Sequence, residues 1–264
     1  MRPIVLGIVL LVAVVNLPVR AAEDAATQAA RWHDLRVAIF GDRAITDGAG
    51  VLTLEAPARA LDAALVPISV TLADPPNVKA LYIIIDANPS PLAGVFHFGP
   101  AADAHMLKTR VRVDQYTLMH AVAETADGHL FVAEQYVKAA GGCSAPSTKN
   151  RELAMARLGQ MKLKAVSEGS DVNALQLLIS HPNNNGMQMD QVTRNYVPAR
   201  YIQDVKVTYG NDLVFQLDAD ISLSEDPAIT FGLTPRGSAP ITVEMHDSST
   251  AVFKQSFDLT AARS

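Results

Sequence analysis

The chain has 264 residues, a hydrophobic fraction of 49%, an aromatic fraction of 6% and a formal net charge of −5. An acidic chain with few aromatic residues lacks the basic surface that nucleic-acid binding requires, so a nucleic-acid-binding protein is excluded. The length suits one large β domain or two of about 120 residues. Either can bury a core without disulfide bonds, and the chain holds a single Cys.

The first 22 residues are typical of a secretion signal. Arg2 supplies a positive start, residues 4–15 form an uncharged apolar run, and small residues follow Pro18 up to Ala22. The apolar run is shorter than the roughly 20 residues of a membrane span. We therefore expect residues 1–22 to be a cleavable signal peptide, and the mature protein to be periplasmic without stable membrane insertion.

The first half, residues 23–138, is predicted to be a helix followed by a β-sandwich. Helical spacing places Trp32, Leu35, Ile39 and Phe40 near one face of residues 25–40, and Gly41 is a plausible stop. The pattern then changes to short strands, with a hairpin signal at Asp127-Gly128. Their spacing predicts an antiparallel sandwich. The expected strands cover 66–72, 81–85, 110–113, 116–124 and 130–138, with a turn at 74–77.

Residues 139–170 are predicted to be a flexible linker followed by a helix. Ala139–Thr148 are small or turn-forming residues without bulk to pack. Helical spacing returns in residues 149–164, and Thr148 is a possible N-cap. Residues 171–264 then show a second sandwich pattern, separate from the first. Its expected strands cover 174–180, 205–209, 213–217, 241–245 and 253–259.

Cys143 is the residue that carries chemistry. Gly141 and Gly142 precede it and allow unusual backbone angles and close approach to another surface. Small residues follow, so we expect an exposed thiol on a slack arm. An odd Cys in an exported protein indicates a reactive thiol or an intermolecular disulfide, although an exposed thiol without a role is the alternative. Nearby cations that could lower its pKa are Lys138, Lys149 and Arg151.

No other pattern predicts catalysis, a metal or a cofactor. The seven His residues show no zinc-ligand spacing, although His97 and His105 could meet across a loop. Met187 and Met189 could suggest Cu(I), but local packing is the simpler interpretation. Residues 224–227, Ser-Glu-Asp-Pro, are expected to be a solvated turn rather than a cation loop. We expect a protein that is not an enzyme.

The layout resembles a fusion of the two subunits of the SoxYZ sulfur carrier, of the kind called quinoprotein dehydrogenase-associated SoxYZ-like carriers. The front half is similar to SoxY through the Trp32 helix, the following strands and the segment from Val137 to Gly141-Gly142-Cys143. The back half is similar to SoxZ. Its matching segments are His181-Pro182, Gly186-Met187, residues 197–202, and residues 224–227 before Phe231.

The resemblance implies two immunoglobulin-like β-sandwiches that pack on each other within the chain. It also implies a periplasmic carrier that holds sulfur intermediates of thiosulfate oxidation on Cys143, with Gly141 and Gly142 as the hinge of the arm. The implied partners are periplasmic sulfur-oxidising enzymes or a quinoprotein dehydrogenase system. One departure stands out: the family arm ends the chain as Gly-Gly-Cys-Gly-Gly, whereas Ser144-Ala145-Pro146 follow here and the chain continues.

Three hypotheses follow. The first is a covalent carrier that presents sulfur on the Cys143 thiolate to partner enzymes. The second is a non-covalent accessory or binding module of a periplasmic dehydrogenase, which would not need the thiol. The third is a redox protein that forms a transient disulfide through Cys143, although the chain lacks a resolving Cys.

Overall fold

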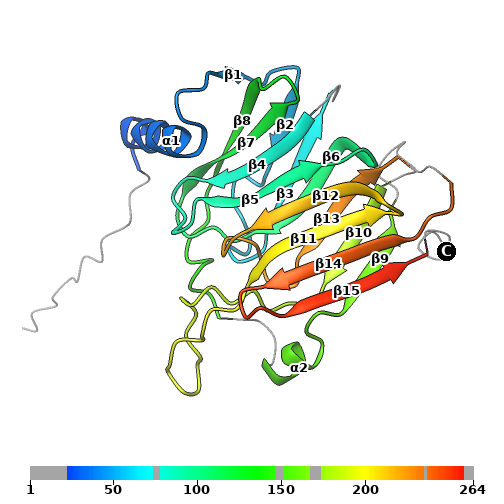
Figure 1. Cartoon of the computed structure of the whole chain (residues 1–264). Coiled ribbons are helices and arrows are strands. Elements are labelled where there is room, and N and C mark those ends of the chain that lie inside the picture. Colours follow the sequence, from blue (N-terminus) through cyan, green and yellow to red (C-terminus); the bar gives the residue numbers. More distant parts are fainter. Residues whose placement is uncertain (1–22, 74–77, 147–150, 167–173, 235–236, 259–264) are drawn as a thin grey trace, which may run out of the picture.

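Strands from both halves of the chain share the same two sheets (Figure 1). The computed structural model describes residues 23–73, 78–146, 151–166, 174–234 and 237–258. The predicted signal peptide, the turn at 74–77 and the helix start at Thr148 lie outside these ranges. The elements are α1 (Ala25–Phe40), β1 (Ile45–Asp47), β2 (Leu52–Glu55), β3 (Val66–Leu72), β4 (Val78–Ile85), β5 (Leu92–Phe98), β6 (Ala102–Val111), β7 (Thr117–Thr125), β8 (Leu130–Val137), α2 (Arg151–Ala156), β9 (Met161–Ala165), β10 (Ala174–Ile179), β11 (Ile202–Tyr209), β12 (Asp212–Ala219), β13 (Ala228–Leu233), β14 (Ile241–Asp247) and β15 (Val252–Phe257).

One sheet has nine strands in the order β1-β8-β7-β4-β5-β12-β11-β14-β15, and the other has six in the order β2-β3-β6-β13-β10-β9. The halves join where β12 pairs antiparallel with β5 and β13 pairs antiparallel with β6. The prediction of a mainly β fold of immunoglobulin-like sandwiches is confirmed. The resemblance implied sandwiches that pack on each other, but the sequence did not show that their strands pair edge to edge.

Aromatic side chains from both halves meet in the core where the sheets join. The Phe96 ring lies 5.7 Å from the Phe215 ring, which lies 5.0 Å from the Phe231 ring in an edge-on arrangement. All three side chains are buried. Such contacts add to the large apolar area that aromatic rings bury, so the join between the halves is part of one continuous hydrophobic core.

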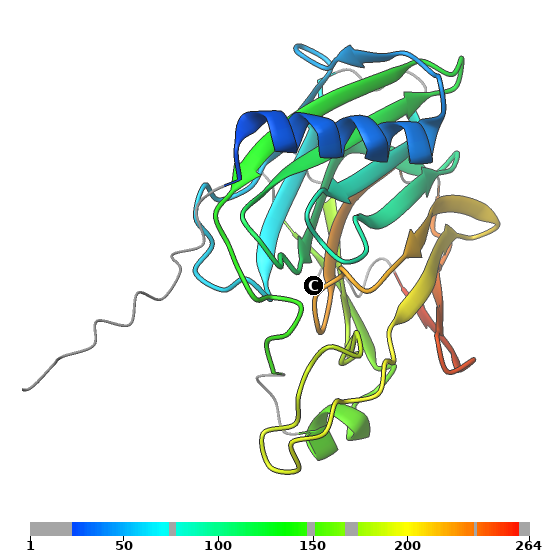
Figure 2. The same cartoon turned by 90° about the vertical axis from the view of Figure 1, so that its left-hand side faces the viewer.

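Helix α1 covers the outer face of the first half of the nine-stranded sheet (Figure 2). Asp24 caps its start by accepting a hydrogen bond from the Thr27 backbone N–H at 2.8 Å, and Gly41 ends it with φ +64°. The Trp32 ring stacks on the buried His120 ring at 3.7 Å. This cover explains why residues 81–85 are apolar without alternation, because β4 is buried on both faces.

The predicted helix at 149–164 is only partly correct. α2 spans Arg151–Ala156, and Met161–Ala165 form strand β9 at the edge of the six-stranded sheet. In β9, Met161 and Leu163 are buried while Lys162 and Lys164 are exposed. This alternation is typical of a half-buried strand, but the same apolar spacing also fits a short helix. Pairing with β10 makes the segment a strand.

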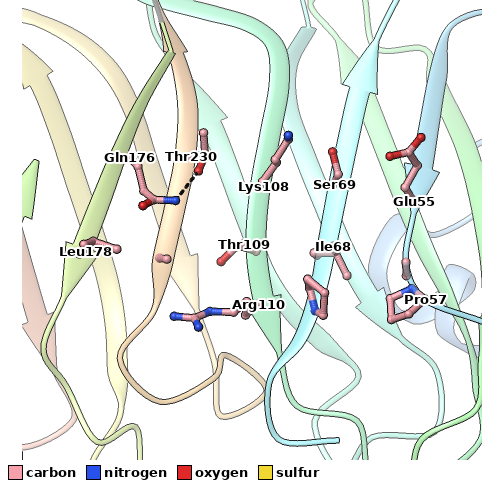
Figure 3. Close-up of a pocket in the computed structure, with 13 residues that line it drawn as sticks. Glu55, Pro57, Ile68, Ser69, Lys108, Thr109, Arg110, Gln176, Leu178 and Thr230 are labelled. Atoms are coloured by element: carbon pink, nitrogen blue, oxygen red, sulfur yellow. Dashed lines mark hydrogen bonds between the residues drawn. The ribbon is translucent and has the colours of Figure 1, made fainter. Parts of the chain in front are cut away.

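The outer face of the six-stranded sheet carries a shallow hollow that polar and apolar residues line together (Figure 3). Strands of both halves contribute to it, with Lys108 and Arg110 from β6 and Gln176 and Thr230 from β10 and β13. Gln176 Nε2 donates to Thr230 Oγ1 at 3.2 Å. Neither helix of the described ranges combines the length and the apolarity that a bilayer crossing demands.

Candidate functional site

Cys143 lies in the segment that follows β8, and it is buried where the first half of the chain meets a loop of the second half. After β8 the backbone follows the neighbouring segment in regular contact: Gly141 N–H donates to Asp114 O at 2.8 Å and Gly142 N–H to Val113 O at 2.9 Å. The Cys143 residue has no solvent-exposed surface. The expectation of an exposed thiol on a slack arm is therefore wrong for this state, because small residues here permit close packing rather than freedom.

The two glycines have local structural reasons. Gly141 has φ +79°, a conformation that residues with a Cβ rarely adopt. Gly142 lies against backbone: a Cβ there would stand 2.0 Å from the Ala63 carbonyl oxygen and 2.7 Å from that of Val113. Both features hold residues 139–146, here named the cysteine arm, close to the sheet. Whether the glycines also act as a hinge stays a prediction.

Replacing Gly142 by Ala is expected to lift the cysteine arm from its seat. The added methyl group meets backbone atoms that cannot rotate away, so we expect a loss of roughly 1–3 kcal/mol in unfolding free energy and a faster reaction of Cys143 with iodoacetamide. Ser144→Ala is the matched control, because the Ser144 side chain is exposed. Equal alkylation rates in the two variants would show that the arm is not seated as described. The measurements are urea unfolding and mass-spectrometric alkylation rates.

A loop of the second half, residues 181–200, holds the arm from the other side. Asn185 Nδ2 donates to the Cys143 carbonyl oxygen at 2.6 Å, and the Asn185 Oδ1 accepts from the Met187 N–H at 2.9 Å. The Asn185 N–H in turn donates to Gln188 Oε1 at 3.1 Å. Asn185 and Gln188 are themselves buried. The backbone of Cys143 is thus fixed by residues of both halves.

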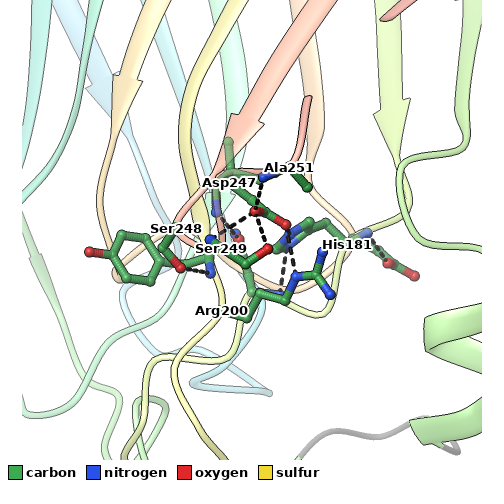
Figure 4. Close-up of polar contacts among 10 residues, drawn as sticks. His181, Arg200, Asp247, Ser248, Ser249 and Ala251 are labelled. Carbon is green, nitrogen blue, oxygen red and sulfur yellow. Dashed lines mark hydrogen bonds and ion pairs between the residues drawn. The ribbon is translucent and has the colours of Figure 1, made fainter. Parts of the chain in front are cut away.

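A buried ion cluster anchors this loop to β14 (Figure 4). Asp247 accepts from Arg200 Nε at 2.8 Å, from the Ser249 N–H at 2.9 Å and from His181 Nε2 at 3.4 Å. Burial raises the pKa of Asp247, but hydrogen bonds from Ser249 and Arg200 outweigh burial and hold it well below its usual value. Asp247 is therefore ionised and fixes both ends of the loop.

His181 in this cluster is neutral. Burial lowers the pKa of His181, and the opposing attraction of Asp247 is weaker. Its Nδ1 accepts from the Asn183 N–H at 3.0 Å, so the proton sits on Nε2, which faces Asp247. The Asn183 side chain donates to Leu223 O and Ser224 O and accepts from the Ile202 N–H. The histidine is a structural element of the loop.

Arg112 lies beneath the cysteine arm and is the largest fully buried side chain of the described residues. Its Nη1 donates to Gly142 O at 3.3 Å and its Nη2 to Asn183 O at 3.5 Å, so it bridges the two halves. Burial lowers the pKa of Arg112, whereas the charge of Glu225 raises it. Glu225 is itself buried, and Ser224 is fully so. The prediction of a solvated turn at residues 224–227 is thus wrong for Ser224, Glu225 and Pro227, which are all buried.

Several buried polar atoms around the cysteine arm have no hydrogen-bond partner. They are Arg112 Nε, Gln188 Nε2 and Ser224 Oγ. Such groups are uncommon in native proteins, since leaving a buried donor or acceptor unpaired is costly. All three belong to residues near the arm and the loop that holds it.

The thiol itself is strongly protonated. Burial and the charge of Asp114 raise the pKa of Cys143 from 9.0 to about 12, and Arg112 opposes this rise. We had expected Lys138, Lys149 or Arg151 to lower it. Among the described residues the cation that lowers it is Arg112, which is distant in sequence. Lys149 and the Arg151 side chain lie outside the described residues, so their effect stays a prediction. The thiol in this structure is therefore inert.

The other residues considered from sequence do not form a site with Cys143. His97 pairs with Asp218 at 3.0 Å and His105 contacts Asp103, so the two histidines do not meet. Met189 lines a cavity beside the arm. In the part of the chain that the structure describes, no three His, Cys, Asp or Glu side chains gather closely enough to hold a metal ion.

Comparison with known families identifies both halves. The family model for "Sulfur oxidation protein SoxY" matches residues 36–143 and that for "Sulphur oxidation protein SoxZ" matches residues 161–258. The SoxY match ends at Cys143. The chain therefore contains a SoxY domain and a SoxZ domain, joined in one polypeptide. SoxY and SoxZ proteins are carrier or accessory proteins rather than catalysts, which agrees with the expectation of a protein that is not an enzyme.

A solved structure is similar to part of the chain. It is the sulfur carrier protein SoxY from Chlorobium limicola f thiosulfatophilum, with 26% identity and a TM-score of 0.37, and the match covers 43% of this chain and 96% of that one. No curated protein matches the chain.

Proposed function

We propose that the protein is an exported, periplasmic carrier that holds a sulfur intermediate covalently on Cys143 and presents it to sulfur-oxidising partner enzymes. The observation that carries this proposal is the position of the single thiol. Cys143 is the last residue of the SoxY domain and lies against the loop of the SoxZ domain that binds its carbonyl oxygen. A carrier residue at this junction is within reach of both domains.

The unpaired polar atoms support a carrier with a protected resting state. Arg112 Nε and Ser224 Oγ lack partners close to the seat of the arm, and a sulfur cargo that bears oxygen atoms would supply acceptors for them. Arg112 already acts electrostatically on the thiol. In this proposal the two domains work as one body: the closed arm shields the cargo, and the arm must leave its seat before a partner reacts with the sulfur.

Protein isolated from its native periplasm is expected to carry sulfur or sulfonate adducts on Cys143, which intact-mass and peptide mass spectrometry detect. A Cys143→Ser strain should lose the sulfur-oxidising activity of the pathway completely, because no other thiol exists in the chain. A Ser144→Ala strain should keep it, since that side chain is exposed beside the same arm. Full activity in the Cys143→Ser strain, with only free thiol in the isolated protein, would remove the carrier role.

The burial of Cys143 favours one second candidate, a non-covalent accessory of a periplasmic system such as a quinoprotein dehydrogenase. A thiol with no exposed surface and a pKa of about 12 is what a purely structural Cys would show. This candidate expects that Cys143→Ser keeps function. The same strain comparison therefore separates the two candidates, and periplasmic fractionation tests the export that residues 1–22 predict.

A further inference from the structure

A cavity of about 240 Å³ lies between α2 and the loop of residues 181–200, beside the cysteine arm. Figure 2 shows the short helix next to this loop. Its described lining is mainly apolar, with Pro146 from the arm, Ala154 and Met155 from α2, and Met189 and Val197 from the loop. Of the three residues with unpaired polar atoms near the arm, only Gln188 lines this cavity. The cavity is therefore separate from the region around Arg112.

One polar group in the lining is unsatisfied. Gln188 is 1% exposed, and its Oε1 accepts from the Asn185 N–H at 3.1 Å. That bond fixes which end of the amide is oxygen and which is nitrogen. The Nε2 group then remains as a buried donor without an acceptor. A buried donor in this situation calls for an acceptor supplied from outside the protein fold.

The lining also restricts the charge and size of that acceptor. Among the described residues of the lining the only charged one is an acid, Asp190, so these residues give a small anion no counter-charge while the cavity removes its hydration. Two methionines offer a deformable apolar surface that adapts to varied shapes. The volume lies below the roughly 300–1,000 Å³ of usual drug-sized sites, which limits the ligand to a few heavy atoms.

We propose that this cavity binds a small, uncharged organic molecule that carries a carbonyl-type oxygen. The oxygen accepts the hydrogen bond of Gln188 Nε2, and the carbon skeleton packs on Met155 and Met189. This site does not depend on the carrier role, since a neutral organic ligand differs from a sulfur oxyanion. It lies next to the arm because Asn185 binds both Gln188 and the Cys143 carbonyl.

The test is a titration of the full protein labelled with [methyl-13C]methionine, followed by NMR. Butanone is the neutral probe, and butyrate is the anionic probe of similar size. The Met155 and Met189 signals are expected to shift with butanone and not with butyrate. The signals of Met119 and Met245, both buried in the core, are expected to stay unchanged. No shift at saturating butanone, equal shifts with both probes, or equal shifts of the core methionines would overturn the proposal.

Two variants test the assignment of the site. Gln188→Glu keeps the acceptor for the Asn185 N–H but replaces the amide donor, so at pH 8 we expect butanone to bind about 10-fold more weakly, the effect of one lost hydrogen bond. Gln203→Glu, at an exposed position, is the control with the same change of charge and should bind normally. Ala154→Phe fills the cavity from α2 and should abolish binding. Unchanged binding in Gln188→Glu or in Ala154→Phe would refute the site.

Discussion

Cys143 in the native protein is expected to react with iodoacetamide at pH 8 at least about 100-fold more slowly than in the urea-unfolded chain. Two causes act together. The residue has no exposed surface, and its pKa is raised from 9.0 to about 12 by burial and by Asp114. The thiolate is the reacting species, so the closed state offers almost none of it. Peptide mass spectrometry at timed intervals gives both rates.

The pH dependence separates the folded thiol from an exposed one. A thiol whose pKa is raised on folding stabilises the folded state below pH 9, and this contribution is lost as the pH rises from 9 toward 12. Between pH 8 and pH 10 the native rate should therefore rise about 100-fold, or tenfold for each pH unit. In the unfolded chain the rise should be only about tenfold, because its thiol titrates near 9. A native rate that levels off near pH 9 would contradict the buried thiol.

Asn185→Ala should raise the native alkylation rate by about tenfold, since it removes the hydrogen bond that holds the Cys143 carbonyl. Asn195→Ala is the matched control in the same loop, with an exposed side chain, and should react like the parent protein. If both variants react like the parent, the loop does not hold the arm closed.

Local patterns predicted much of the fold. The helix at residues 25–40, the strand at 66–72 and the hairpin around Asp127-Gly128 are all present, because each depends on periodicity and turn residues within a short window. The pairing of β5 with β12 has no such local signal. It joins residues more than 110 positions apart, and only the continuous core around Phe96 and Phe215 explains why these edges meet.

The role of Cys143 as the site stays a prediction, and its burial was not predicted. Cys143 and its two glycines stood out from sequence, yet a run of small residues was interpreted as a linker. The same smallness lets Gly142 approach the Ala63 carbonyl closely. Arg112 was missed, since an Arg in an alternating segment is usually a solvated residue. The side chains of Asn183 and Asn185 are buried hydrogen-bonding groups in a loop, and no local pattern in the sequence indicates this.

Arg112→Met is expected to lower the free energy of unfolding by about 3–5 kcal/mol, the range for breaking a buried charge pair by removing one partner. The methionine keeps much of the apolar stem of the side chain. It removes the positive charge that Glu225 attracts, and it removes the two donors to Gly142 O and Asn183 O. Glu225→Gln in addition should restore part of the loss. Arg59→Met, at an exposed position, should change stability by no more than about 0.5 kcal/mol.

Because Arg112 bridges the arm and the loop of the second half, its loss should free the arm before the sheets unfold. Alkylation of Cys143 in Arg112→Met should therefore begin at urea concentrations below the unfolding midpoint, whereas in Arg59→Met both events should coincide. Coincident transitions in Arg112→Met, with the stability of the control, would mean that Arg112 does not hold the two halves at the thiol.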